Sequence, residues 1–116
     1  MVEEWRDIVG YNSKYQISNF GNIKSYKRYK KGKILSPTKD KDGYFQIGLR
    51  DENNRRKCHR IHRLVANAFI LNPNKFTEIN HKDNNPSNNN VENLEWCTIE
   101  YNNKYRFTHC NGNNKG

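Results

Sequence analysis

Three short stretches decide the fold of this chain, and they read Glu78-Ile79-Asn80-His81-Lys82-Asp83, Asn93-Leu94-Glu95-Trp96 and Asn102-Asn103. Residues 77–80 and 94–97 have the composition of two short strands. Thr98 has a side chain suited to an N-cap, and Glu100 falls in the first turn of a helix that we expect to run to about Arg106. The sequence therefore predicts a strand, a long asparagine-rich loop, a second strand and a helix.

The same residues carry the parts of one kind of chemistry. A hairpin with a helix packed on it would bring the amide oxygens of Asn80 and Asn102 to one point beside His81. Mg²⁺ takes oxygen ligands and keeps several waters, and a histidine with a pKa of about 6.5 can accept a proton from attacking water. These parts suit metal-assisted phosphodiester hydrolysis. On an extended chain, however, Asn80 and His81 face opposite ways unless the strand bends, and 20 of 116 residues are asparagine, so chance also produces such spacings.

Upstream, hydrophobic periodicity predicts one helix and several short strands. Apolar residues recur at the spacing of one helix face at Ile61, Leu64, Val65, Ala68 and Phe69. Asn72-Pro73 is expected to end that helix. Short strands are expected at residues 15–18, 23–26, 33–35 and 44–49. The first two flank a turn at residues 19–22, and the last two are expected to form a hairpin with Asp42-Gly43 as its turn signal.

The charge points to a polyanionic partner. Lysine and arginine number 21 against 12 aspartate and glutamate, which gives a formal net charge of +9. One basic cluster is interleaved with tyrosines and contains Lys24, Lys27, Arg28, Lys30, Lys31 and Lys33. A second cluster, at residues 55–63, contains Arg60 and Arg63. Cations neutralise phosphate while phenol rings stack or hydrogen-bond, so nucleic acid is favoured over an ordinary solvated basic face. Composition alone does not separate DNA from RNA.

The cysteines and the hydropathy pattern limit the compartment. Cys58, Cys97 and Cys110 are an odd number without a CxxC pair, which favours free thiols over a disulfide framework. A mixed metal site drawn from Cys58, His59, His62, His109 and Cys110 is the alternative. No apolar run approaches the ~18–20 residues that span a bilayer, and no signal peptide follows Met1. We therefore expect an intracellular protein of the host cytoplasm without a membrane partner.

Two motifs occur in a recognisable order. Residues 80–83, Asn89, 91–98 and 102–103, with the upstream run 62–69, form a pattern that resembles the HNH endonucleases of phages and mobile introns, over about residues 59–105. Residues 4–8, 10–11 and 15–25 are similar to the NUMOD-type module that precedes such nuclease cores. The resemblance implies a β-rich DNA-binding module at 1–56, a nuclease core at 57–107 and a polar tail at 108–116.

The resemblance also implies an α+β fold and a set of site residues. A small antiparallel N-terminal sheet would precede a ββα-metal core, in which two strands, a loop and a helix cradle one divalent cation, Mg²⁺ or Mn²⁺. His81 matches the general base, Asn80 and Asn102 match the metal ligands, and Asn93 matches the asparagine that fixes the loop and holds the histidine. His81, Asn93 and Asn102 thus form the expected catalytic set. Relatives often have aspartate where this chain has Asn80, and a neutral amide should hold Mg²⁺ less tightly.

The leading hypothesis is a metal-dependent endonuclease, derived from a phage or mobile element, that nicks or cuts double-stranded DNA. The residues expected to hold the duplex are Lys24, Lys27, Arg28, Lys30, Lys31, Lys33, Arg60 and Arg63. The sequence leaves a homodimer open. Two alternatives remain: a DNA-binding module of the same fold with a silent site, for which Asn80 is the indicative feature, and a small RNA-binding protein that needs no metal.

Overall fold

A nine-residue helix, α1 (Ile61–Phe69), lies at the centre of residues 1–105, the part of the chain that this computed structural model describes. Ile61, Leu64 and Val65 on its apolar face are buried, which confirms the predicted helix. The helix ends at Phe69, before Asn72-Pro73, because Ile70 is extended and donates its N–H to the Ala66 carbonyl at 3.0 Å.

The first sheet contains four antiparallel strands in sequence order: β1 (Trp5–Asp7), β2 (Tyr15–Ser18), β3 (Ile23–Ser25) and β4 (Lys33–Leu35). Ile17 and Ile23 pair across β2 and β3 and are fully buried. The predicted turn at residues 19–22 joins these two strands, with the Ser18 N–H donated to the Asn22 carbonyl at 2.8 Å.

The second sheet corrects the predicted pairing of residues 33–35 with 44–49. It contains β5 (Thr38–Lys39), β6 (Phe45–Arg50) and β7 (Arg56–Arg60), all antiparallel. β4 pairs with β3 instead. The Asp42-Gly43 turn is present, but it joins β5 to β6, because the Asp40 carboxylate accepts the N–H groups of Asp42 and Tyr44 and closes the chain there.

The strand β7 was not predicted, because four of its five residues are basic and none belongs to the apolar pattern. It pairs with β6 over its whole length. The expected boundary between residues 56 and 57 falls inside this strand, and the division into module, core and tail stays a prediction. The tail, 108–116, and the helix end near Arg106 lie outside the described residues.

The third sheet is the predicted hairpin of β8 (Glu78–His81) and β9 (Leu94–Cys97), joined by a loop that ends in the short 3-10 helix η1 (Val91–Asn93). Residues 99–105 are helical, and the Thr98 hydroxyl accepts the Tyr101 N–H at 3.0 Å, which confirms the predicted N-cap. The antiparallel sheets and two helices give the α+β fold class that the sequence predicts.

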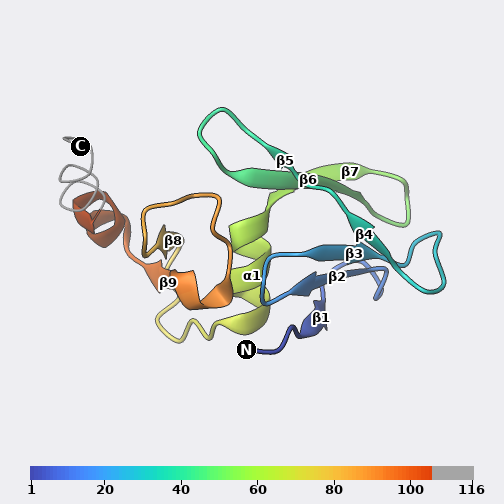
Figure 1. The fold of residues 1–116 in the computed structure, drawn as a ribbon, viewed down its shortest axis with the longest axis horizontal. Coiled ribbons are helices and arrows are strands. Elements are labelled where there is room, and N and C mark those ends of the chain that lie inside the picture. Colours follow the sequence, from blue (N-terminus) through green and yellow to red (C-terminus); the bar gives the residue numbers. More distant parts are fainter. Residues whose placement is uncertain (106–116) are drawn as a thin grey trace.

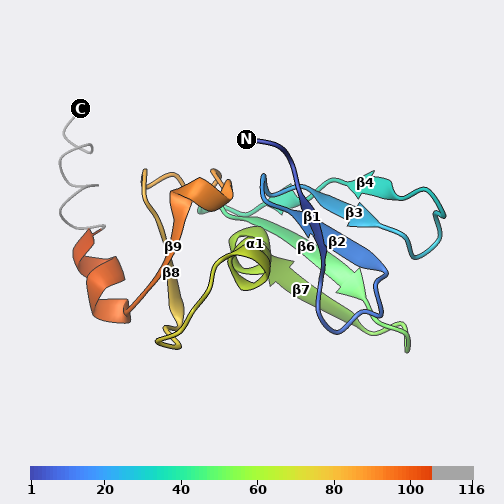
Figure 2. The ribbon, with the colours of Figure 1, turned by 90° about the horizontal axis from the view of Figure 1, so that it is seen from below.

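The three sheets share α1 as their common neighbour. Figure 1 shows β1 to β7 on one side of the helix and β8, β9 and helix 99–105 on the other, and Figure 2, which looks along α1, shows the same division. The core extends across it, since Ile17, Leu49 and Val65 belong to the same buried cluster as Ile79 and Leu94. Among residues 1–105, no helix combines the length and apolar character needed to cross a bilayer.

Candidate active site

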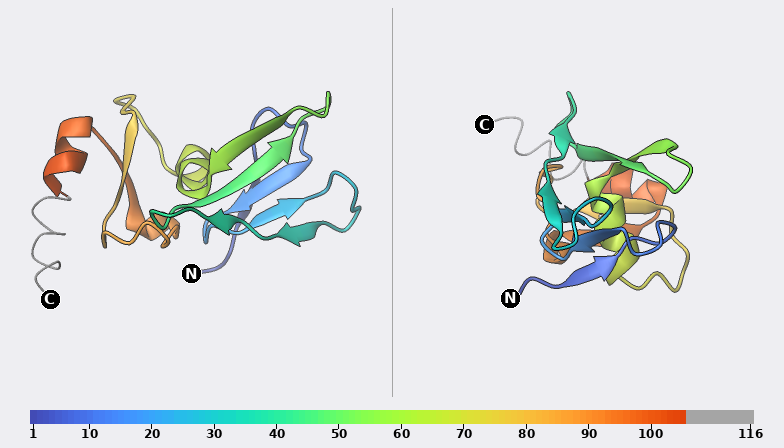
Figure 3. Two further views of the ribbon diagram at one scale, coloured as in Figure 1. Left: turned by 90° about the horizontal axis from the view of Figure 1, so that it is seen from above. Right: turned by 90° about the vertical axis from the view of Figure 1, so that its right-hand side faces the viewer.

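Asn80, His81 and Asn102 line one open cleft. The elements that carry them, β8 and helix 99–105, lie at one end of the molecule (Figure 3). The cleft has a volume of about 200 Å³, and its wall also includes Tyr44, Ile79, Asn84 and Pro86. Asn80 and His81 are both buried, at 1% and 6% exposure, although they are neighbours on β8. His81 is the last residue of the strand, and the chain turns after it, with the Asn84 N–H donated to the His81 carbonyl. The predicted base and ligands therefore come together.

The His81 ring is held in one orientation by Asn89. The His81 Nε2 lies 3.0 Å from the Asn89 Oδ1. Because a carbonyl oxygen only accepts, Nε2 has to carry the proton, which leaves Nδ1 as the nitrogen with a free lone pair. Burial lowers the pKa of His81 below its ordinary value of 6.5, against smaller opposite effects of Asn89 and Asp83. His81 is therefore neutral at pH 7, as a general base has to be.

A second buried histidine stands beside the first. The ring of His62, on α1, lies 5.0 Å from the His81 ring, and Tyr44 packs 5.5 and 5.9 Å from the two rings, centre to centre. Burial lowers the pKa of His62 to about 3, with further contributions from His81 and two arginines. From the sequence, His62 belongs to the run 62–69 of the HNH-like pattern and to the alternative Cys/His metal site, but its position at a helix start does not predict that it faces His81.

Asn80 and Asn102 offer oxygen atoms to a cation. The Asn80 Nδ2 donates to the Glu95 Oε2 at 2.7 Å, while no residue within 1–105 donates to its Oδ1. Helix 99–105 carries Asn102 at the same cleft. Amide oxygens with room for waters fit a hard cation such as Mg²⁺. Residues 1–105 contain no cluster of three or more His, Cys, Asp or Glu suited to a metal, and His109 and Cys110 of the alternative Cys/His site lie outside that range.

Asn93 fixes the loop between the strands but does not hold the histidine. Its side chain accepts the Asp83 N–H at 3.0 Å and donates to the Asp83 carboxylate and the Asn88 carbonyl, each at 2.9 Å. The hydrogen bond to His81 comes from Asn89 instead. Asn89 belongs to the HNH-like pattern of the sequence, but its position among three consecutive asparagines at 88–90 does not predict a contact with His81.

The N-terminal sheet supports this loop directly. Gly21, in the turn between β2 and β3, has a φ of +89°, and a Cβ atom there would lie 3.0 Å from the Asn89 Cβ and 3.3 Å from its carbonyl oxygen. The neighbouring Asn19 carbonyl accepts the Val91 N–H at 2.9 Å. The turn of the first sheet therefore positions the residue that orients His81.

Most of the predicted DNA-binding lysines lie far from the cleft. The β3–β4 connection that carries Lys27, Arg28, Lys30 and Lys31 is at the opposite end of the molecule from β8 (Figure 1). The ammonium groups of Lys24 and Lys33 lie over the rings of Trp5 and Tyr29, at 4.1 and 5.0 Å.

The two predicted arginines have different surroundings. The Arg60 guanidinium lies 4.6 Å from the centre of the Tyr44 ring, so it stands at the edge of the cleft, and it pairs with Asp40 at 3.3 Å. Arg63 donates to the Thr77 carbonyl at 2.9 Å and is thus engaged with the protein.

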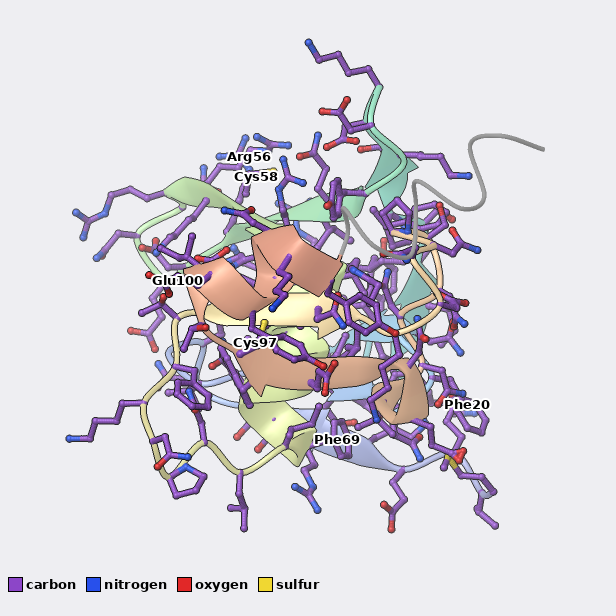
Figure 4. All side chains as sticks on the ribbon, turned by 90° about the vertical axis from the view of Figure 1, so that its left-hand side faces the viewer. Phe20, Arg56, Cys58, Phe69, Cys97 and Glu100 are labelled. Atoms are coloured by element: carbon purple, nitrogen blue, oxygen red, sulfur yellow. The ribbon has the colours of Figure 1, made fainter. Side chains whose placement is uncertain are left out.

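The second sheet presents further arginines that the site prediction omitted. Arg50 pairs with Arg56, and Gln46 pairs with Arg60, so the three arginines share one face of β6 and β7. All three are exposed. Figure 4 shows Arg56 and Cys58 together on β7, away from Cys97, the last residue of β9. The alternation in residues 56–60 was the available signal for this face.

The comparisons with known proteins agree with the two motifs. Residues 3–50 match the NUMOD4 motif, and residues 59–104 match the HNH endonuclease model. Residues 59–104 therefore belong to the HNH endonuclease family. The resemblance found in the sequence is confirmed.

Relatives of this HNH chain occur in viruses. It is 43% identical over 108 residues to an uncharacterised HNH endonuclease of Acanthamoeba polyphaga mimivirus, which covers 93% of this chain and 31% of the relative. It is 41% identical over 99 residues to the DNA endonuclease I-HmuI of Bacillus phage SP01, with coverage of 85% and 55%. A solved structure of DNA binding and cleavage by I-HmuI is similar with a TM-score of 0.78 at 39% identity, covering 90% of this chain and 58% of that one. This chain therefore spans only part of the length of these relatives.

The buried His62 predicts that acid destabilises this HNH chain. The folded protein binds a proton on His62 only near pH 3, whereas the unfolded chain binds it near 6.5, so stability falls as pH drops below 6.5. At pH 5 the loss through His62 is roughly 2 kcal/mol. Urea unfolding at pH 7 and pH 5 should show a smaller pH-dependent loss in His62→Gln than in the wild type. An equal loss in both proteins would contradict the prediction.

Replacing Gly21 tests the support of the loop. Gly21→Ala should destabilise the fold by about 1–3 kcal/mol, because alanine is strained at this φ and its Cβ would press on Asn89. The His81 imidazole resonances in NMR spectra should shift as well. Gly10→Ala, where φ is +95° but nothing lies within 4 Å of the new Cβ, is the control for strain alone. Equal His81 shifts in both variants would show that Gly21 has no special link to the site.

Proposed function

We propose that this chain is a DNA endonuclease that hydrolyses phosphodiester bonds at the cleft between β8 and helix 99–105, with one divalent cation, Mg²⁺ or Mn²⁺. The observation that carries the proposal is the convergence of a neutral, oriented His81 with two amide ligands, Asn80 and Asn102, in one open cleft. The relative I-HmuI, named a DNA endonuclease, supports the choice of DNA. Relatives in a phage and in a mimivirus support an origin in a virus or a mobile element.

In this proposal His81 acts on the attacking water. Its Nδ1 takes the proton. The positive charge that then develops on the ring is stabilised by the hydrogen bond from Nε2–H to the Asn89 side-chain carbonyl. Asn80 and Asn102 would hold the cation through their amide oxygens. When bound, the cation stabilises negative charge on the scissile phosphate and leaving oxygen. Arg60, at the edge of the cleft above Tyr44, is placed to contact a neighbouring phosphate.

Double-stranded DNA fits the distribution of positive charge. Exposed arginines extend from Arg60 at the cleft, along Arg56 and Arg50 on one face of the second sheet, to Arg28 beyond it. Lys27 is half-buried, and its ammonium donates to the Arg50 and Asp51 carbonyls. The last step of this track is continuous, since Lys27, Arg28 and Arg50 border the same hollow. A rigid row of cations can contact several successive phosphates of a duplex, whose backbone is regular. A flexible single strand could make the same number of contacts without such a rigid face.

Plasmid cleavage tests the function. The purified protein should convert supercoiled DNA to open-circle or linear DNA with Mg²⁺ or Mn²⁺ and not with EDTA. His81→Ala should cut about 10²–10⁴-fold more slowly, because the general base is lost, while DNA binding stays intact. His59→Ala is the matched histidine control, since His59 bonds Tyr11 outside the cleft. A wild-type protein that binds DNA but never cuts it would favour the silent binding module, and full activity in His81→Ala would remove His81 from the mechanism.

Salt dependence tests the predicted DNA-binding cations of the β3–β4 connection. About six phosphate contacts would give a log–log slope of affinity against salt near −5. Replacing Arg28, Lys30 and Lys31 together with glutamine should weaken binding on all sequences equally and make the slope shallower by up to about 3. Lys14→Gln, an exposed lysine on the β1–β2 connection, is the control. A dissociation constant that does not change with salt would contradict the assignment of these residues to DNA.

A further inference from the structure

A carboxylate that the proposed mechanism does not use lies against one of its metal ligands. Glu95 on β9 stands opposite Asn80 on β8 in the strand pairing, and its Oε2 accepts the Asn80 Nδ2–H at 2.7 Å. Asn80 is almost completely buried, so this contact is shielded from water on the side of Asn80. Glu95 is not among the residues that line the cleft, and it borders a separate hollow with Phe76 and Tyr101.

This contact decides which way the Asn80 amide faces. A carboxylate can only accept a hydrogen bond, so the group of Asn80 that faces it has to be the amide NH₂ group and not the amide oxygen. The Asn80 Oδ1 is then directed away from Glu95. No residue within 1–105 donates to this oxygen, and no buried side-chain oxygen or nitrogen in that range lacks a partner. The oxygen therefore keeps solvent contact, which on a residue that lines the cleft makes it available to a cation.

Glu95 also reaches the element that carries the second ligand. The Tyr101 hydroxyl donates to the same Oε2 of Glu95, at 3.4 Å. Tyr101 precedes Asn102 on helix 99–105, and its own N–H is held by the Thr98 hydroxyl at the helix start. One carboxylate oxygen thus joins β8, β9 and the helix, the three elements whose relative positions set the distance between Asn80 and Asn102.

Besides its hydrogen bonds, Glu95 contributes a negative charge next to the two proposed ligands. The two ligands, Asn80 and Asn102, are neutral amides, and the net charge of the chain is +9. Asp83, the other carboxylate near His81, is bound up in the loop through Asn88 and Asn93. A negative charge in contact with Asn80 attracts a cation. It also polarises the amide, which makes the Asn80 oxygen a stronger ligand for a metal ion.

We propose that Glu95 is the positioning residue of the metal site: it turns the Asn80 oxygen toward the cation, fixes helix 99–105 beside it and supplies the negative charge that the two amide ligands lack. The proposal rests on the proposed function, because it assumes a cation held by Asn80 and Asn102. It explains how a chain with asparagine before the histidine keeps a functional cation site.

Exchanging the charge between the two partners tests the proposal. Glu95→Gln keeps an oxygen that can accept from Asn80 but removes the charge, and it should weaken Mn²⁺ binding to the full chain about 10–100-fold. Asn80→Asp in the Glu95→Gln background returns the charge to the site and lets the amine of the introduced glutamine donate to the new carboxylate. This double variant should bind Mn²⁺ at least as tightly as the wild type. Asn80→Asp alone sets two carboxylates against each other and should fall short of the double variant.

The measurement is Mn²⁺ affinity by electron paramagnetic resonance or calorimetry, without DNA, with thermal unfolding of each metal-free variant as a check on folding. Glu92→Gln is the matched control, since Glu92 is exposed on η1 and should leave the affinity unchanged. Equal Mn²⁺ affinity in Glu95→Gln and in a wild type that cuts DNA would overturn the role of Glu95 alone. A wild type that neither binds Mn²⁺ nor cuts DNA would contradict the proposed function and this inference together.

Discussion

The rest of the structure depends on the burial of α1 between sheets that do not otherwise form one layer. The helix packs against β2, β6 and β7 on one side and against β8, β9 and η1 on the other. Each large aliphatic side chain buried there contributes about 1.5–3 kcal/mol to the free energy of unfolding. Pairing between short strands of three to six residues could not replace that contribution. The same helix carries His62 against His81. The packing that stabilises the fold thus also sets the environment that keeps both histidines neutral.

The two sequence motifs act as one physical unit at the loop between β8 and β9. A loop rich in asparagine has little apolar surface to hold it, and here side-chain amides bind the backbone instead, with Asn93 and Asp83 at the centre. The close approach of Gly21 to Asn89 adds a contact from the first sheet. The orientation of His81 is therefore fixed from two directions, from within the loop and from the NUMOD4 part of the chain. A site built this way needs both parts to be folded.

The sequence predicted those features that repeat along the chain. Helical periodicity located α1, and strand composition with the Thr98 cap located β8, β9 and helix 99–105. The sequence predicted the wrong partner for β4, because an Asp-Gly turn does not show which of two nearby short strands precedes it. The hydrogen bonds of the Asp40 carboxylate, which close the turn after β5, are visible only in the structure. Asn89 and Glu95 were missed for a related reason. Both lie within the HNH-like pattern, but their roles come from contacts with residues of other elements, which the local sequence does not show.

If Asn80 and Asn102 hold a cation as proposed, the charge balance of the chain explains why that site needs a carboxylate such as Glu95. A protein with a net charge of +9 attracts phosphate and repels divalent cations over the same distance, within a Debye length of about 8 Å at physiological salt. Neutral amide ligands do not offset that repulsion. A carboxylate in contact with a ligand attracts the cation at short range, where salt screens the interaction least. The phosphate of a bound duplex adds negative charge to the same cleft. In the proposed mechanism, cation and DNA should therefore stabilise each other in the site, and the positive surface that binds DNA would keep the affinity for the cation low until DNA is bound.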